Sequence, residues 1–152
     1  MDVRELQSSD QKAWLAMRAA LWPHCASERQ ISEMHAYFSG GGLLATFVAV
    51  DGDGALRGFI EASLRPCAEG CTTRPVGYIE GIFVQPAFRR RGIARRLVEA
   101  AESWAVSCGC VEFASDCRTD NATSIRFHES LGFAAAKRLV HFRRDVPDVG
   151  EE

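Results

Sequence analysis

The junction between residues 76 and 108 constrains the fold more than any other part of the chain. An apolar, β-branched run from Val76 to Val84 predicts a buried strand, which Pro86 ends. An arginine-rich loop then leads at Gly92 into a helix that extends to Cys108, with apolar residues at helical spacing. A second buried run follows at Val111–Ser115. Strand, helix and strand in this order form a βαβ unit, so we expect an α/β domain.

The other predicted elements complete a mixed sheet. The expected order is β, α, α, β, β, β, α, β, α, β, with elements at Val3–Leu6, Ser9–Leu21, Ser27–Phe38, Leu43–Val50, Leu56–Leu64, Val76–Val84, Gly92–Cys108, Val111–Ser115, Asn121–Leu131 and Phe133–Arg143. The length of 152 residues fits one domain. We therefore predict a central mixed (α+β) sheet flanked by about four helices, with one domain over residues 1–146 and a disordered tail over residues 147–152.

Charge and composition exclude several classes of function. The formal net charge is −2, which is not the strongly basic balance of a nucleic-acid-binding domain. The N-terminus lacks a signal-peptide pattern, and no apolar stretch approaches the ~18 residues that a membrane span needs. The cysteines have C-x-x-x-C and C-x-C spacings rather than the pairs typical of zinc sites. We therefore expect a cytoplasmic protein with free thiols and with no metal, membrane or nucleic-acid partner.

The loop that opens the long helix has the chemistry of an anion site. The first amide groups of a helix have no partner within it, and the helix dipole adds positive potential there. Arg89, Arg90 and Arg91 contribute charged donors, and Gly92 lets the backbone approach a ligand closely. A diphosphate fits such a site. Three arginines in a loop can also be a merely solvated basic patch, but their place between a buried strand and a helix start favours phosphate binding.

Two carboxylates favour a cationic substrate. Glu80 interrupts an apolar strand, and a buried carboxylate is costly unless it has a partner or a task. Asp116 follows the end of the neighbouring predicted strand. Carboxylates that converge on a cleft suit a positively charged amine. The alternative is that Glu80 forms a structural ion pair with an arginine.

Two motifs resemble those of the GNAT N-acetyltransferases. Arg89-x-x-Gly92-x-Ala94 matches the (Q/R)-x-x-G-x-(G/A) acyl-CoA motif of that family, in the same setting between a fourth strand and a third helix. Asn121 precedes a helix that ends in Leu131-Gly132-Phe133, as in the family's following motif. The resemblance covers nearly the whole chain in element order. It implies a GNAT-like fold and acetyl-CoA as co-substrate.

The resemblance also implies roles for individual residues. The backbone at the end of the strand is expected to bind the pantetheine arm, and the loop and first helical turn are expected to hold the diphosphate. The implied cofactor-binding residues are Ile82, Phe83, Val84, Arg89, Arg90, Arg91, Gly92, Ile93, Ala94, Arg95 and Asn121. His128 stands where the family usually has a tyrosine that protonates the departing thiolate. It either donates that proton or only packs under its helix.

Narrower details resemble the aminoglycoside 6'-N-acetyltransferases, namely Leu21-Trp22-Pro23, the segment Glu80–Val84, Ala114-Ser115-Asp116 and His128. This resemblance implies an antibiotic-resistance enzyme that acetylates the 6'-amino group of an aminoglycoside. It also implies that Trp22, His24, Glu80 and Asp116 line the acceptor pocket. Our mechanistic hypothesis gives Glu80 the role of general base.

Two further expectations concern partners. Related enzymes often pair, so we expect a homodimer. A polyamine, a small metabolite or a protein N-terminus is an alternative acceptor within the same family. An alternative from another class is a non-catalytic RNA-binding module that uses Arg89–Arg91, although the chain lacks the aromatic platforms and basic charge of such modules.

Overall fold

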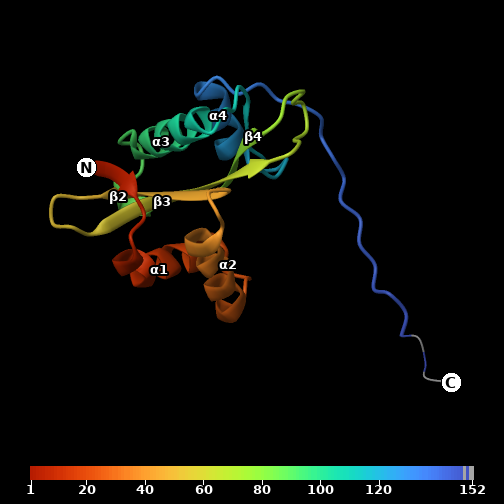
Figure 1. The fold of residues 1–152 in the computed structure, drawn as a ribbon, viewed down its shortest axis with the longest axis horizontal. Coiled ribbons are helices and arrows are strands. Elements are labelled where there is room, and N and C mark those ends of the chain that lie inside the picture. Colours follow the sequence, from red (N-terminus) through yellow and green to blue (C-terminus); the bar gives the residue numbers. More distant parts are fainter. Residues whose placement is uncertain (149, 151–152) are drawn as a thin grey trace.

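The chain folds as one sheet with helices on both faces, in a computed structural model that describes residues 1–148 and 150 (Figure 1). The strands are β1 Asp2–Glu5, β2 Leu44–Val50, β3 Leu56–Arg65, β4 Val76–Val84 and β5 Phe113–Ala114. The helices are α1 Gln11–Leu21, α2 Ser27–Ser39, α3 Ile93–Ser107 and α4 Ala122–Ser130, with 3-10 turns at Ser8–Asp10 and Pro86–Phe88. Sheet order is β1-β2-β3-β4-β5, antiparallel except for the parallel pair β4 and β5. The predicted mixed sheet with about four helices is confirmed.

Apolar packing closes both faces of the sheet. α1 and α2 cover one face, where Trp14, Met34 and Phe59 are buried in one cluster. α3 covers the other face, and its fully buried Leu97 and Ala101 belong to the second cluster. β4 therefore lies between α1 on one side and α3 on the other. Among the described residues, no helix has both the length and the apolar character that crossing a membrane requires.

β4 separates from β5 partway along its length. β4 pairs with β3 from Val76 to Val84, but with β5 only at Gly77 and Tyr78. Within the described part of the chain, the outer edge of Ile79–Val84 therefore has no strand partner. The register with β3 shifts at Glu80, which is left without an opposite residue. Such a bulge bends a strand and redirects a side chain, so the sheet opens beside the residue expected to be the base.

The last predicted strand, Phe133–Arg143, is not formed. Phe133 packs on Phe113, with ring centroids 6.1 Å apart, and the chain then leaves the domain as an extended segment (Figure 1). All of residues 134–148, here called the C-terminal arm, are exposed. The prediction is wrong for a single chain, because a strand needs a neighbour and no described segment pairs with the arm. Of the predicted tail, residues 149, 151 and 152 lie outside the described residues.

Candidate active site

Glu80 lies at the bulge and is bound by an arginine. Arg65 Nε and Nη2 donate to the two carboxylate oxygens of Glu80, at 2.9 and 2.8 Å. Ser63 Oγ donates to Glu80 Oε1 at 2.5 Å. The hydrogen bonds from Arg65 to Glu80 raise the pKa of Arg65. The arginine pair that the sequence left as an alternative is therefore formed, and the sequence analysis had not selected Arg65.

Arg65 connects Glu80 to the second predicted carboxylate. The Arg65 guanidinium carbon lies 3.5 Å from the centroid of the Tyr78 ring. The Tyr78 hydroxyl donates a short hydrogen bond to Asp116. Burial, followed by this hydrogen bond, raises the pKa of Tyr78 above its ordinary range. Glu80 and Asp116 thus lie at the two ends of one chain of contacts, with a cation between them.

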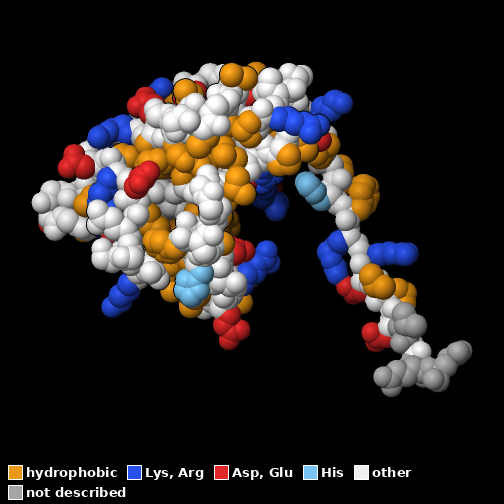
Figure 2. All heavy atoms as spheres, in the orientation of Figure 1, with side chains coloured by type: hydrophobic (Ala, Val, Ile, Leu, Met, Phe, Trp, Pro, Cys, Tyr) orange, Lys and Arg blue, Asp and Glu red, His pale blue; other side chains and the backbone are white. Residues whose placement is uncertain are grey.

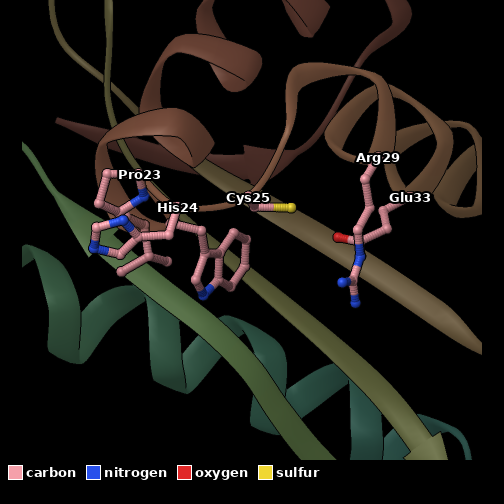
Figure 3. Close-up of a pocket in the computed structure, with 7 residues that line it drawn as sticks. Pro23, His24, Cys25, Arg29 and Glu33 are labelled. Carbon is pink, nitrogen blue, oxygen red and sulfur yellow. The ribbon is translucent and has the colours of Figure 1, made fainter. Parts of the chain in front are cut away.

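Two adjoining cavities lie beside α1 and α2, and the inner one also borders the sheet. The inner cavity, of about 310 Å³, is lined by Arg18, Trp22, Glu33, Ala36, Tyr37, Leu44, Glu61 and Glu80. The outer cavity, of about 420 Å³, is lined by Leu21, Trp22, Pro23, His24, Cys25, Arg29 and Glu33. In Figure 3, His24 lies at one end of the outer cavity, and Arg29 and Glu33 lie at the other.

The structure brings three of the four predicted acceptor residues to these cavities. Trp22 lines both of them, His24 lines the outer one, and Glu80 lines the inner one. Asp116 lines neither, since it lies beyond the Arg65–Tyr78 stack.

Trp22 rests directly on the backbone of β4. A Cβ atom added to Gly81 would lie 2.5 Å from Trp22 Cζ2, which is too close for any side chain. Glycine at this position therefore lets the indole lie over the strand, immediately beside Glu80. Trp22 also lies under the Arg18 guanidinium, 4.8 Å from its ring centroid, so the indole is held from both sides.

A second buried carboxylate, Glu61, was missed by the sequence analysis. Its side chain is 1 % exposed and forms an ion pair with Arg18 Nε at 2.9 Å. Trp14 Nε1 and the Tyr37 hydroxyl donate to its two oxygens at 3.0 and 3.2 Å. Burial raises the pKa of Glu61 to about 7. The signal was present in the sequence, because Glu61 interrupts the apolar Leu56–Leu64 run as Glu80 interrupts its own strand.

We expect Glu61 to make stability fall as pH rises. Its folded-state pKa of about 7 lies above the ordinary value of 4.5, so the folded state prefers the protonated form. The resulting stabilisation is complete below pH 4.5 and is lost as pH passes 7. Relative to Glu61→Gln, the wild-type free energy of unfolding should drop by up to about 3 kcal/mol between pH 5 and pH 8. Urea titrations of both proteins at several pH values measure this, and parallel pH profiles would contradict it.

The loop before α3 is shaped by two left-handed residues. Arg90 has φ 64° and Gly92 has φ 78°, and Gly92 is the N-cap of α3. The first backbone bond within the helix runs from Arg96 N to Gly92 O, so the preceding amides of Ile93, Ala94 and Arg95 have no partner in the helix. A Cβ atom added to Gly92 would meet nothing within 4 Å. The helix start is therefore open to an anion.

The arginines of this loop differ in what they do. Arg89 Nε donates to the Val84 carbonyl at 2.7 Å, which ties the loop to the end of β4. The Arg91 guanidinium lies 5.3 Å from the Phe88 ring centroid. Arg95 reaches the Ser130 carbonyl at 3.4 Å. Arg89, Arg90 and Arg91 are all exposed beside the helix start, and direct diphosphate binding by each of them stays a prediction.

α4 presents Asn121 and His128 near β5. Asn121 Oδ1 accepts from Ser124 N at 3.0 Å and caps the helix, and the neighbouring Asp120 pairs with Arg118. His128 Nδ1 lies 2.7 Å from the Ser124 carbonyl, which has no proton, so Nδ1 donates. In the neutral ring, His128 Nε2 then accepts from the Ser115 hydroxyl at 2.8 Å. His128 is half-buried and joins α4 to the end of β5.

The described residues contain no group of three or more histidine, cysteine or acidic side chains placed to hold a metal ion. Their six cysteines are free thiols.

Comparisons with known proteins show which proteins the whole chain is similar to. Residues 4–133 match the model of the acetyltransferase (GNAT) family. The aminoglycoside N(6')-acetyltransferase type 1 of Klebsiella aerogenes is 40% identical over 146 residues, or 95% of this chain and 96% of the relative. The enzyme of that name from Serratia marcescens is 41% identical over 135 residues, covering 88% and 92%. A solved structure of AAC(6')-Iy with the bisubstrate analog CoA-S-monomethyl-acetylneamine superposes with a TM-score of 0.90, at 34% identity over 95% of this chain and 98% of that one.

Proposed function

Because the chain belongs to the acetyltransferase (GNAT) family, we propose that it transfers the acetyl group of acetyl-CoA to the 6'-amino group of an aminoglycoside. The observation that carries the proposal is the position of Glu80. This carboxylate lies in the wall of the inner cavity, at the bulge where β4 turns away from β5. A cation held in the cavity would thus lie beside the open strand edge. The similarity to aminoglycoside N(6')-acetyltransferases over almost the whole chain supports this choice of acceptor.

The residues present fit coenzyme A. In this proposal the free edge of Ile82–Val84 supplies backbone groups for the pantetheine arm, and the unpaired amides of Ile93–Arg95 bind the diphosphate together with Arg90 and Arg91. Asn121, at the start of α4, completes the pantetheine site. Acetyl-CoA supplies the thioester carbon that the amine attacks. Two results distinguish this proposal from an RNA-binding module. RNA binding that weakens steeply with salt would support the module, whereas competition by coenzyme A would support the acetyltransferase.

The proposed chemistry needs one base and one acid. Glu80, directly or through a water molecule, takes a proton from the ammonium group, and the neutral amine forms the new C–N bond as the C–S bond breaks. Backbone N–H groups of Ile82–Val84 stabilise the oxyanion. His128, with protons on both ring nitrogens, gives its Nε2 proton to the thiolate, either itself or through the Ser115 hydroxyl that it binds, and the proton that the nitrogen loses as the amide forms replaces it. Turnover that is unchanged in a folded His128→Ala variant would assign His128 to packing alone.

An assay of acetyl transfer tests the proposed activity. Purified protein with acetyl-CoA and kanamycin or tobramycin should give a product with one added acetyl group, and mass and NMR analysis should place it on the 6'-nitrogen. Spermidine and a peptide with a free N-terminus serve as the competing acceptors. Faster turnover of either one, or modification at another nitrogen, would overturn the proposed acceptor while leaving the family assignment in place.

We further propose that the protein is a cytoplasmic homodimer in which the C-terminal arm adds to a second copy. The arm residues Leu139, Val140, Phe142 and Val146 are 51%, 77%, 92% and 84% exposed. Figure 2 shows apolar side chains along the arm. β5 is an edge strand, and no described strand pairs with its outer side. Strand addition to such an edge would bury the arm's apolar residues, and a two-fold axis would exchange the arms reciprocally. A reducing cytoplasm suits six free thiols.

We expect the arm to decide the oligomeric state. Light scattering should give twice the mass of one chain for the full protein, and the mass of one chain for a variant that ends at Ala136. Phe142→Asp should also give the mass of one chain, because a charge is costly to bury in the new strand pair. Phe38→Asp, at an exposed aromatic residue on α2, is the matched control and should stay paired. A full-length protein with the mass of one chain would contradict the proposal.

A further inference from the structure

The Phe88 ring, in the 3-10 turn that follows β4, contacts two guanidinium groups. The guanidinium carbon of Arg57 lies 4.5 Å from the ring centroid, and that of Arg91 lies 5.3 Å from it. Both distances are within the ~6 Å at which an aromatic ring attracts a cation over its face. The ring is half-buried and packs against the apolar cluster that contains Leu97. The core therefore fixes the position of the ring beside the loop before α3.

The two arginines at this ring differ in whether their charge is balanced. Arg57, on β3, has its Nε 2.7 Å from Asp51 Oδ2 and its Nη2 3.6 Å from Asp53 Oδ2. Arg91 is exposed, and no carboxylate of the described residues lies within ion-pair distance of it. Of the two cations that contact Phe88, Arg91 is therefore the one whose charge is available to an anion.

Contact with the ring leaves the donors of Arg91 available as well. A guanidinium has several N–H donors, and an aromatic ring attracts its charge without using them up in conventional hydrogen bonds. Arg91 can therefore stay over Phe88 while its N–H groups bind a phosphate. Arg91 directly precedes Gly92, the N-cap of α3, where the amides without helical partners begin. The ring thus holds a positive charge beside the amides that we assign to the diphosphate.

An arginine held in place binds an anion more tightly than a freely moving one. An exposed arginine samples many rotamers, and fixing one of them on binding costs free energy. The Kd rises by the inverse of the fraction of free protein in which the side chain is already in the binding position. A cation–π contact at an exposed site favours that position by about 3- to 5-fold. Loss of the ring should weaken binding by a similar factor.

We infer that Phe88 is a positioning residue for the cofactor: its ring holds Arg91 at the start of α3 in the free protein, ready for the diphosphate of coenzyme A. The inference rests on the diphosphate site of the proposed function. Phe88 does not touch the ligand in this scheme and acts only through Arg91. Its contribution to binding should therefore vanish when residue 91 carries no charge.

A double-mutant cycle on the Kd for coenzyme A, measured by calorimetry, tests this dependence. Arg91→Met should raise the Kd about 10- to 30-fold, because it removes a charge-assisted donor. Phe88→Leu should raise the Kd about 3- to 5-fold in the wild-type background, but by less than about 1.5-fold in the Arg91→Met background. Phe88→Tyr keeps an aromatic ring and should bind within about 1.5-fold of wild type.

Arg90→Met supplies the matched control background, because Arg90 is exposed in the same loop but its guanidinium lies over no aromatic ring of the described residues. There Phe88→Leu should keep its full effect. An equally large effect of Phe88→Leu in the Arg91→Met background would mean that the ring acts through packing of the loop, and would overturn the inference. An unchanged Kd in Phe88→Leu or in Arg91→Met would overturn it too. A wild-type protein that does not bind coenzyme A would instead overturn the proposed function.

Discussion

Replacing Glu80 with glutamine should lower kcat for acetyl transfer by about 10²- to 10³-fold and leave the Kd for coenzyme A within about twofold. The amine attacks the thioester only after it has lost a proton, and an amide cannot accept that proton. Glutamine keeps the shape of the side chain and still offers an oxygen to Ser63 Oγ, which lies 2.5 Å from Glu80 Oε1. The coenzyme contacts proposed for Ile82–Val84 and the loop before α3 do not involve this carboxyl group. Stopped-flow or steady-state assays, paired with calorimetry for coenzyme A, measure both quantities.

The ion pair with Arg65 demands a second variant. Glu80→Gln also leaves the Arg65 guanidinium without its anionic partner, so a free cation in the acceptor site could by itself repel the substrate. The double variant Arg65→Met/Glu80→Gln removes that cation. If loss of the base is the cause, turnover stays low in the double variant; recovery to within about tenfold of wild type would assign the defect to the freed arginine. Glu33→Gln, in the wall of both cavities, is the control for a general loss of negative charge.

Local patterns in the sequence were enough to predict the centre of the fold. The Val76–Val84 strand, the turn at Gly92 and the amphipathic α3 are all confirmed, because apolar periodicity and a glycine at a helix start are local signals. The same signals predicted a long Val111–Ser115 strand, where only Phe113 and Ala114 pair. Strand length depends on the neighbour, and β4 turns away from β5 after Tyr78.

The partners of the charged residues could not be predicted in this way. The position of Glu80 in an apolar strand predicted that the carboxylate has a partner or a task. Nothing local identifies Arg65 as the partner, since the pair joins residues 15 apart on two strands. The bulge at Glu80 decides which face the carboxylate takes. Arg18 likewise reads as an ordinary helical residue, yet it is 2% exposed because Glu61 and Glu33 both bind it. Cross-strand and helix-to-sheet pairs of this kind become visible only in three dimensions.

Because contacts between distant residues cannot be read from local sequence, the missing strand of the C-terminal arm could not be predicted either. Its β-branched and aromatic residues correctly indicate strand propensity, but propensity does not say which chain supplies the partner. In a single chain these residues lie in solvent. A pattern typical of a strand with no partner in its own domain is itself a reason to examine assembly.

The proposed diphosphate site should respond strongly to one negative charge at Gly92. Gly92 is the N-cap of α3, has φ 78° and has open space around it, and asparagine and aspartate are the residues that best tolerate this conformation. Gly92→Asn and Gly92→Asp therefore have almost the same shape and differ in charge. Two like charges about 4 Å apart near a protein surface repel by several kcal/mol before screening by salt. We expect the Kd for coenzyme A to be about 30- to 100-fold higher in Gly92→Asp than in Gly92→Asn.

The Tm of the two variants shows whether weaker binding of coenzyme A comes from the added charge or from misfolding. An aspartate at the start of a helix interacts favourably with the positive end of the helix dipole, so Gly92→Asp should have a Tm equal to or above that of Gly92→Asn. The carboxylate would thus stabilise α3 through the same positive potential that we assign to diphosphate binding. The gap between the two Kd values should narrow as salt is raised from 50 to 500 mM, because exposed charges are screened. Equal Kd values in the two variants at low salt would mean that coenzyme A does not bind at the start of α3, and the assignment of Ile93–Arg95 would then have to be abandoned.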